Sequence, residues 1–317
     1  MKTIMTSTLP VMLFASVVVL LYYLWGRLWL TWLIRKLRKK DPGRVLTSRF
    51  AISVHIVAVI GIGCMLYGYF VEPYWIQINT ISIHTDKLKQ AHFRVVQISD
   101  LHCDRHVRLE PKLPAIINAL KPDVIVFTGD CLNQASALGL FQETLSKMNA
   151  PLGKFAVTGN WDFNYWSQLK LFKNTGFEEL RLSEKTIEKD GESIVIAGLA
   201  YENGRVSQKV VGQLRPELFN LFLYHNTSLI DYFGDKPIDL YLCGHTHGGQ
   251  IALPFYGALT TLSRHGKKFE AGLYRQGHIR LYVNRGIGLE GGWAPRVRFF
   301  ARPEIAVFDI GPENPVE

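Results

Sequence analysis

Seven Asp, Asn and His side chains of this sequence lie at or just beyond the ends of apolar segments. The first two follow the run FRVVQIS, and most of the others belong to short glycine-containing motifs, GD, GN and GHTHGGQ. The seven residues are Asp100, His102, Asp130, Asn160, His225, His245 and His247. Because loops at the carboxyl ends of strands meet along one edge of an α/β sheet, this order predicts that the seven side chains converge.

Apolar runs of strand length alternate with segments of helical spacing from about residue 90 onwards. The helical segments cover 109–120 and 136–148, where apolar residues recur every three or four positions. The predicted strands are 93–99, 124–127, 155–157, 194–197, 221–224, 240–242, 279–283 and 305–308. Such alternation is typical of a sheet whose faces are covered by helices, so we expect an α/β fold.

Two long apolar runs, residues 9–34 and 50–71, precede this alternating part. Each has about 20 residues or more, enough to cross roughly 30 Å of hydrocarbon as a helix. Trp and Tyr residues cluster towards the ends of these runs, as interfacial anchors do. We therefore predict a membrane arm of two hydrophobic helices and a basic loop over 1–75, and a globular domain over 76–317. The alternative is a pair of buried core helices.

The formal net charge of +9 is concentrated in the predicted arm. Residues 1–72 carry nine Lys and Arg and two acids, a net of +7, which leaves 27 Lys and Arg against 25 acids in the remainder, a net of +2. This distribution indicates a membrane surface as partner, with no nucleic acid expected. A nuclease is disfavoured for the same reason.

The loop at 35–49 contains seven Lys and Arg, which the positive-inside rule places in the cytoplasm. Two full spans would then put the globular domain outside the cell. A hairpin that does not cross, or one segment that does not span, would keep it on the cytosolic side. We expect a bacterial cytoplasmic (inner) membrane, with the side of the globular domain left open.

Mixed carboxylate, amide and imidazole side chains are typical ligands of Mn, Fe or Zn rather than of Ca or Mg. Two such ions about 3.5–4 Å apart activate a water molecule and clamp a phosphate during phosphoryl hydrolysis. A single Asp or His would more commonly be structural, but seven in this order predict a site for two divalent metal ions, with Mn preferred. The series therefore predicts a metal-dependent phosphohydrolase.

The motif order D-x-H, GD, GN, H and GH-x-H over residues 93–308 resembles that of the calcineurin-like metallophosphoesterase superfamily. The resemblance implies a double β-sheet sandwich flanked by helices, and attack by a metal-bound hydroxide. It implies a first metal held by Asp100, His102, Asp130 and His247, and a second held by Asp130, Asn160, His225 and His245, with Asp130 bridging. It also implies catalytic roles for Asp100, Asp130, Asn160 and His245.

One position departs from the family pattern, because Trp161 follows the GN dipeptide where the family usually has a His that assists the leaving group. An indole supplies no proton at neutral pH. A general acid matters most for a poor leaving group such as an alkoxide, and little for a phosphate. The departure therefore favours phosphoanhydride cleavage, unless His106 or His265 donates the proton or the enzyme tolerates a slower rate.

The membrane arm together with these motifs resembles the membrane-associated branch of the superfamily, whose members include UDP-2,3-diacylglucosamine pyrophosphatases of lipid A biosynthesis. The resemblance implies cleavage of UDP-2,3-diacylglucosamine to UMP and the lipid monophosphate. Because that substrate is made on the cytosolic side, the assignment requires a cytosolic catalytic domain. The alternatives are a broad-specificity phosphodiesterase or lipid-headgroup phosphatase, and a non-catalytic membrane scaffold.

Several residues near the motifs have less specific interpretations. Asp162 either orients the loop after Asn160 or caps a following helix. We interpret the basic residues 264–268 as a solvated loop, with phosphate or headgroup binding as the alternative, and Arg296, Arg298 and Arg302 as solvated surface residues. The apolar stretch 253–262 is interpreted as part of an acyl-chain groove or as a loop packed on the sheet.

Overall fold

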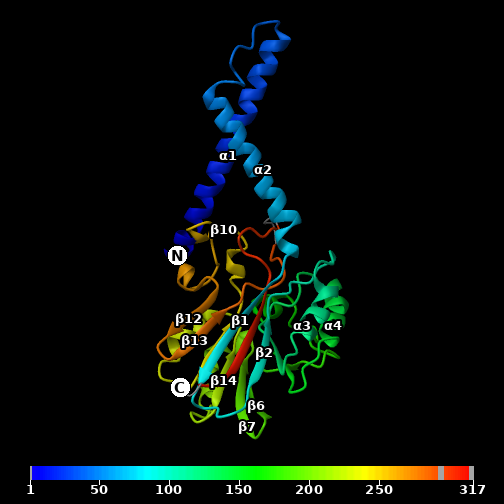
Figure 1. Ribbon diagram of the computed structural model, residues 1–317, viewed down its shortest axis with the longest axis vertical. Helices are drawn as coiled ribbons and strands as arrows, with labels where there is room; N and C mark the ends of the chain where they lie inside the picture. Colours follow the sequence, from blue (N-terminus) through cyan, green and yellow to red (C-terminus); the bar gives the residue numbers. More distant parts are fainter. Residues whose placement is uncertain (1, 292–295, 314–317) are drawn as a thin grey trace. The chain divides into compact units, whose positions relative to one another are not determined.

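The computed structural model describes residues 2–291 and 296–313, and the chain divides into two compact units, Met1–Val71 and Glu72–Glu317 (Figure 1). The first unit consists of helices α1 (Lys2–Leu37) and α2 (Arg49–Phe70). The indole of Trp25 donates to His55 at 2.9 Å, and the hydroxyl of Tyr22 donates to the Ala58 carbonyl at 3.1 Å. These contacts hold the two helices together as a pair.

Both helices are long and apolar enough to cross a membrane, by length and composition. Their large apolar side chains are mostly exposed, including Leu13 and Val17 on α1 and Val59 and Ile60 on α2. A core helix of a soluble protein would bury such residues, so the alternative of two buried core helices does not describe this arm. The exposed apolar surface suggests membrane association.

The second unit is built from two six-stranded sheets. The first sheet has the order β1 (Gln77–Thr85), β14 (Glu304–Pro312), β2 (Phe93–Ile98), β3 (Val124–Phe127), β4 (Lys154–Ala156) and β5 (Glu178–Glu179). The second has the order β12 (Gly272–Gln276), β13 (Ile279–Val283), β9 (Leu240–Cys243), β8 (Phe219–Leu223), β7 (Glu192–Leu199) and β6 (Leu182–Lys189). A short hairpin, β10 (Ala252–Leu253) and β11 (Gly257–Ala258), stands apart from both sheets.

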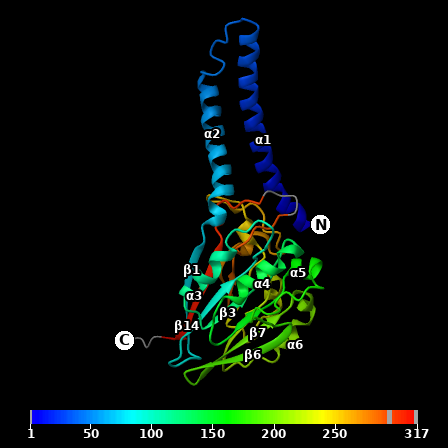
Figure 2. The same ribbon diagram turned by 90° about the vertical axis from the view of Figure 1, so that its right-hand side faces the viewer.

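The sheets pack against each other, and helices cover their outer faces (Figure 2). Alternation along β2 explains this layering, because Val95 belongs to the core between the sheets whereas Val96 packs in the core with α3 (Leu113–Ala119) and α4 (Leu138–Ser146). On the second sheet, Phe222 packs outwards with Val210 of α6 (Ser207–Val211). The expected double-sheet α/β fold is confirmed.

The inner strands of each sheet run parallel, which determines where their loops emerge. β2, β3 and β4 are mutually parallel, as are β7, β8, β9 and β13. The carboxyl ends of β2, β3 and β4 therefore lie along one edge of their sheet, and those of β8 and β9 along one edge of the other. The loops that follow these five strands carry all seven residues of the series.

Candidate active site

The structure brings the seven predicted residues together at the carboxyl ends of the two sheets. Two groups of side chains each place potential ligand atoms within 4.8 Å of one another. The first group is Asp100, His102 and His247, and the second is Asp130, His225 and His245. Asn160 joins the second group, because its Oδ1 lies 2.9 Å from Nε2 of His225.

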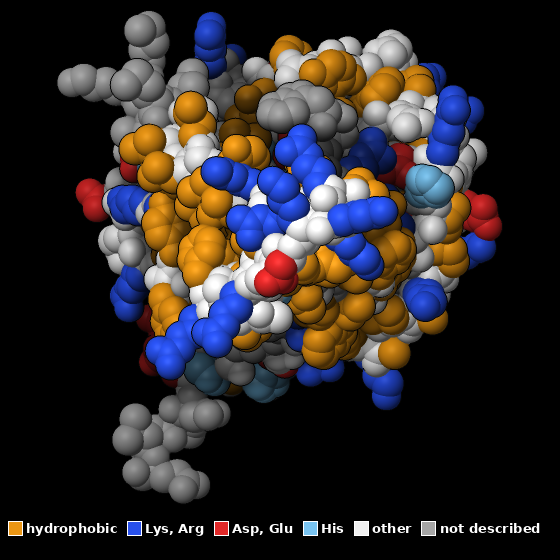
Figure 3. Space-filling model, turned by 90° about the horizontal axis from the view of Figure 1, so that it is seen from above, with side chains coloured by type: hydrophobic (Ala, Val, Ile, Leu, Met, Phe, Trp, Pro, Cys, Tyr) orange, Lys and Arg blue, Asp and Glu red, His pale blue; other side chains and the backbone are white. Residues whose placement is uncertain are grey.

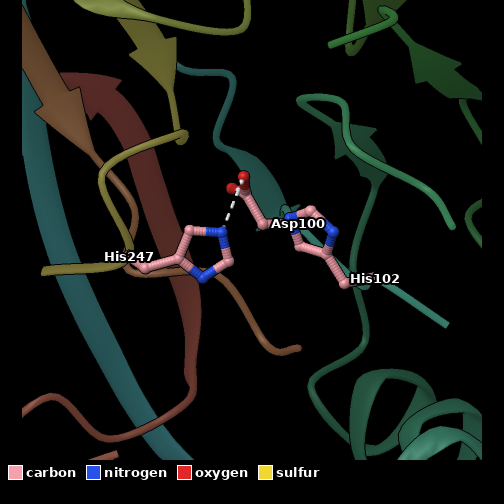
Figure 4. A group of neighbouring side chains, drawn as sticks. All are labelled: Asp100, His102 and His247. Carbon is pink, nitrogen blue, oxygen red and sulfur yellow. Dashed lines mark ion pairs between the residues drawn. The ribbon is translucent and has the colours of Figure 1, made fainter. Parts of the chain in front are cut away.

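The first group combines residues from loops of both sheets (Figure 4). Nε2 of His247 lies 3.4 Å from Oδ1 of Asp100, the ion pair drawn in the figure. Nε2 of His102 lies 3.6 Å from Oδ2 of Asp130, which belongs to the second group. The Asp130 carboxylate therefore faces both groups.

The second group centres on His225. Its Nε2 lies 3.2 Å from Oδ2 of Asp130 and 3.2 Å from Nδ1 of His245. All of these side chains are buried except His245, which is partly exposed. Imidazole and carboxylate atoms that meet in this way can bind a transition-metal ion.

Hydrogen bonds outside the two groups orient the imidazoles. Nδ1 of His225 lies 2.8 Å from the Thr128 carbonyl, which can only accept, so this nitrogen carries a proton. Asn133 donates its amide to the carbonyls of His102 and Leu289, and its Oδ1 lies 3.0 Å from Nδ1 of His102. With a metal ion bound, both imidazoles would be neutral and would direct the lone pair of Nε2 towards the centre, as metal-binding histidines do.

Two buried imidazole nitrogens lack a hydrogen-bond partner among the described residues. They are Nε2 of His102 and Nε2 of His247, and both face carboxylates of the site. A buried polar atom without a partner costs about 1–3 kcal/mol, so native proteins seldom leave one unsatisfied. A divalent cation would satisfy both nitrogens and both carboxylates, so the donor set fits the two metal ions of this kind of centre.

The electrostatics of the site also favour bound cations. Burial lowers the pKa of His225, but the carboxylates of Asp130 and Asp100 outweigh burial and raise that pKa to about 10. Burial raises the pKa of Asp100, but the imidazoles of His247 and His225 hold it below its ordinary value. The negative field that retains a proton on His225 would equally attract a divalent cation.

Five of the seven residues occupy the left-handed region of backbone conformation. Their φ angles are 50° for Asp100, 41° for His102, 59° for Asp130, 74° for His245 and 53° for His247. Such conformations cost roughly 1–3 kcal/mol each and cluster at functional sites, where the surrounding structure holds them. The strain indicates that the loops are shaped to direct these side chains inwards.

Two glycines allow the loops to approach one another closely. A Cβ atom on Gly159 would lie 2.1 Å from Oδ1 of Asp130, and one on Gly244 would lie 2.1 Å from Oδ2 of Asp100. Neither carboxylate could keep its position beside a larger residue. The GN and GH motifs therefore require glycine because the site is packed so tightly.

Asp162 orients the loops that carry Asp130 and Asn160. Its Oδ2 accepts from the backbone N–H groups of Asp130 at 2.8 Å and Gly159 at 2.9 Å, and its Oδ1 accepts from that of Cys131 at 2.9 Å. Burial raises the pKa of Asp162, the charge of Asp130 raises it further, and the pKa reaches about 7. The side chain both caps helix α5 (Asn160–Tyr165) and orients the loop. The two roles that the sequence offered for Asp162 as alternatives are therefore both present.

We expect Asp162→Asn to lower both stability and metal retention. An amide offers one acceptor oxygen, so its NH₂ group would face the Cys131 N–H and leave that buried donor unsatisfied, at a cost of about 1–3 kcal/mol. Thermal unfolding with parallel metal analysis measures both effects. Asp309→Asn, at a half-exposed ion pair with Arg94, is the matched control, and it should change the melting temperature and the metal content little. Equal melting temperatures for the two variants would refute this role of Asp162.

Trp161 lies against the first group instead of the usual imidazole. Its ring packs edge-on against His102 with centroids 5.3 Å apart, and its indole Nε1 donates to Glu290 at 2.9 Å. Its backbone N–H donates to Oδ1 of Asp130 at 2.9 Å. The alternative proton donor His265 has both ring nitrogens in contact with other side chains, Thr227 and Asp231.

The sequence interpretation of Arg298 as a solvated residue is wrong. The side chain is fully buried, and its guanidinium donates to the carbonyls of Gly288 at 2.6 Å and Ala301 at 2.7 Å. Its Nη2 also lies 3.3 Å from Nδ1 of His247. Arg298 thus fixes the loops behind the first group. Neither Arg298 nor Glu290 lies in a motif, so their roles depend on chain segments that only the fold brings together.

The double sheet and its paired Asp–His clusters are the structure of a metal-dependent phosphohydrolase. Residues 93–249 match the family model described as calcineurin-like phosphoesterase. The chain belongs to this family, which uses a dinuclear metal site, and the expected enzyme class is confirmed.

Relatives of the chain match it along most of their length. The uncharacterized metallophosphoesterase YkuE of Bacillus subtilis is 35% identical, over 78% of this chain and 91% of its own. The UDP-2,3-diacylglucosamine pyrophosphatase LpxG of Chlamydia muridarum is 27% identical, over 81% of this chain and 95% of its own. The phosphodiesterase YaeI of Escherichia coli is 29% identical, over 77% and 92%.

Proposed function

We propose that this enzyme cleaves the phosphoanhydride of a lipid-linked nucleotide, UDP-2,3-diacylglucosamine, to UMP and the lipid monophosphate. The observation that carries this proposal is Trp161. The only polar atom of its side chain is the indole Nε1, a donor that already bonds to Glu290. The position therefore supplies no proton to a leaving group. A phosphate leaves without such help whereas an alkoxide requires it, so an anhydride suits this site better than an alkyl ester.

In this proposal, residues 76–317 form the catalytic domain and residues 1–75 anchor it to the membrane. Asp100, His102, Asp130 and His247 would hold one metal ion, and Asp130, Asn160, His225 and His245 the other. Two divalent ions, of which Mn suits the donors best, would supply a nucleophile at neutral pH and positive charge for the phosphate oxygens. Asp162, Asn133 and Arg298 position these ligands through the contacts described above.

A cavity beside the second group offers a place for the nucleoside. Its volume is about 720 Å³, within the range of ligand pockets. Tyr224 directly precedes His225 and lines the cavity together with Tyr201, whose ring centroid lies 6.2 Å from that of His225. Aromatic rings provide stacking surfaces for a planar base. Arg264, also in the lining, carries a charge that suits a phosphate-bearing ligand.

We expect Arg264→Ala to raise KM for the nucleotide-linked substrate about tenfold, the loss of roughly one charge-assisted hydrogen bond, with little change in kcat. KM for the small diester bis(p-nitrophenyl) phosphate, which cannot fill the cavity, should not change. Arg275→Ala removes an exposed arginine of β12 that does not line the cavity and is the matched control. An equal change of KM for both substrates would show that the cavity does not select the nucleotide.

The match to the chlamydial pyrophosphatase supports this substrate, and the match to the phosphodiesterase YaeI defines the competing one. The test is UMP release from UDP-2,3-diacylglucosamine by the detergent-purified full chain, compared with hydrolysis of bis(p-nitrophenyl) phosphate. We expect metal-dependent UMP release to have the higher kcat/KM. Diester hydrolysis without UMP release would retain the hydrolase and replace the proposed substrate by a phosphodiester.

A further inference from the structure

We propose that the catalytic unit itself binds the surface of an anionic phospholipid bilayer through a patch termed the rim surface. Its apolar members are Trp75, Phe255, Leu262 and Phe300, and its basic members are Lys267, Lys268 and Arg302. No part of this inference depends on which phosphate compound the enzyme cleaves. It assigns a role to the exposed apolar residues of the stretch 253–262 and to the basic residues beside them.

Phe255 is the most exposed large apolar side chain of the described residues. It lies at the tip of the β10–β11 hairpin, fully accessible at 111% of its reference area, with φ at 65°. A bulky residue at positive φ is a conformational outlier, and an exposed phenylalanine gains nothing from water. The hairpin therefore holds an apolar ring outwards at a conformational cost, which indicates a partner outside the unit.

Leu262 and Phe300 repeat both properties of Phe255. Leu262 is 69% exposed with φ at 51°, and Phe300 is 59% exposed with φ at 53°. Phe255 and Leu262 are directed into solvent, whereas Ala258 and Leu259 of the same stretch are buried. The exposed residues of 253–262 therefore do not pack on the sheet.

Backbone contacts join these loops into one surface. The Ala252 N–H donates to the Phe299 carbonyl at 2.8 Å, and the Leu259 N–H donates to the Ile251 carbonyl at 3.0 Å. The guanidinium of Arg302 lies 4.0 Å from the centroid of Trp75, and the backbone N–H of Phe300 donates to Glu72 at 3.0 Å. The hairpin, the 299–302 segment and the start of the unit are therefore neighbours.

The position of the rim surface along the chain indicates a bilayer as its partner. Helix α2, with its exposed apolar side chains, ends at Phe70, and Glu72 is fastened to the rim segment only two residues later. Two residues span at most about 7 Å. A chain that leaves a membrane helix at Phe70 therefore enters the catalytic unit at the rim surface, with Trp75 at interfacial depth.

The charges of the rim surface suit anionic headgroups. Lys267, whose ammonium lies 4.2 Å from the Tyr256 ring and pairs with Glu270, and Lys268 are both exposed on the segment that follows Leu262. Basic residues beside exposed aromatic and aliphatic ones are typical of surfaces that bind anionic membranes. Figure 3 shows the chain from above, where Lys and Arg side chains lie among hydrophobic ones.

The rim surface also continues directly from the candidate active site. Gly249 lies two residues after His247 of the first group. Ala258 of the hairpin packs against it so closely that a Cβ atom on Gly249 would lie 2.6 Å from the Cβ of Ala258. Gln250 and Ile251 then lead into β10. A bilayer bound at the rim surface would thus lie beside the site where a phosphate linked to a lipid must be delivered.

The test uses the full chain in vesicles of phosphatidylcholine and phosphatidylglycerol whose acyl chains are brominated and quench tryptophan on contact. Phe255→Trp adds a reporter at the hairpin tip. Glu188→Trp adds one to an exposed position of β6, opposite Ser193 near the amino end of β7 and so at the far end of the strands from the site. The fluorescence of the introduced tryptophan is obtained by subtracting the emission of the unsubstituted chain from that of each variant. Melting temperatures equal to that of the unsubstituted chain establish that both variants fold.

We expect the added emission at position 255 to fall by at least about half in brominated vesicles, because interfacial side chains enter the acyl boundary by roughly 5–10 Å. The emission added at position 188 should be unquenched. Charge reversal by Lys267→Glu and Lys268→Glu should reduce the quenching at position 255 when phosphatidylglycerol is present. Unquenched emission at position 255 would overturn the proposal and leave a protein partner or a second copy of the chain as the occupant.

Discussion

Asp130→Asn is expected to abolish metal-dependent turnover while the protein remains folded. The carboxylate of Asp130 faces both groups, with Oδ2 3.2 Å from His225 and 3.6 Å from His102. Loss of its charge removes several kcal/mol of metal and phosphate stabilisation, which corresponds to a fall in kcat of roughly a thousandfold or more. The measurement is kcat together with the metal content of the purified chain.

Asparagine at position 130 removes the charge while it leaves the conditions for folding unchanged. Asparagine tolerates the positive φ of this position, and its Oδ1 can still accept from the backbone N–H of Trp161. We therefore expect a cooperative thermal transition close to that of the unsubstituted protein when both are free of metal. Wild-type kcat in Asp130→Asn would refute the bridging role of Asp130.

Trp161→His is expected to accelerate alkyl phosphodiester hydrolysis much more than phosphoanhydride hydrolysis. The introduced imidazole would stand beside His102 and Glu290, in contact distance of the groups that now surround the indole. A general acid contributes roughly 10²–10⁴-fold where the leaving group needs a proton. We expect a gain towards the lower end of that range for the alkyl ester, and a change of less than about threefold for the anhydride.

Trp161→Phe is the control that distinguishes the effect of adding an acid from the effect of removing the indole in Trp161→His. Phenylalanine removes the bond to Glu290 and supplies no acid, so the alkyl ester should not be cleaved faster by this variant. The ratio of the two kcat values is compared among the three proteins. Equal acceleration of both substrates by Trp161→His would remove the leaving-group argument for the proposed substrate.

The inner strands were predictable because their sequences carry the signal of burial on both faces. VIVF at Val124–Phe127 is fully buried, and its short length and β-branched residues favour a strand between two layers. β1 (Gln77–Thr85) was not predicted, since an edge strand alternates exposed and half-buried residues and its pairing partner, β14, lies more than 200 residues later. The hairpin strand β6 pairs with the adjacent β7, but most of its residues are exposed or half-buried, so it carries no clear signal of burial.

The candidate ligands could be found in the sequence because each belongs to a short motif at the end of a strand. Arg298 and Glu290 could not, because their importance arises from contacts between segments far apart in the chain. Arg298 reaches His247 across 51 positions, and Glu290 receives the Trp161 indole across 129. Their sequence neighbourhood contains no periodic pattern, and an arginine there resembles any surface arginine. The roles of the seven motif residues as metal ligands remain predictions to be tested by the substitutions above.

We propose that a membrane arm, a strained pair of Asp–His clusters and an exposed apolar rim act together in one enzyme. In this proposal the clusters would hydrolyse the phosphate compound, and Trp161 would favour anhydrides. The cavity at Tyr201 and Arg264 would hold the nucleoside, and the rim surface would contact the lipid. Each part has its own test, so failure of the substrate assignment would leave the metal centre and the membrane contact standing.

A two-metal hydrolase is tested by titrating the chelator-treated full chain with Mn²⁺ while bound metal per chain and UMP release from UDP-2,3-diacylglucosamine are followed together. We predict no turnover without metal, and activity that rises to its maximum as two ions bind, with Asp130→Asn failing to reach that occupancy. Turnover that persists after complete removal of metal, or full occupancy by two ions without hydrolysis of any phosphoanhydride or phosphodiester, would contradict this prediction.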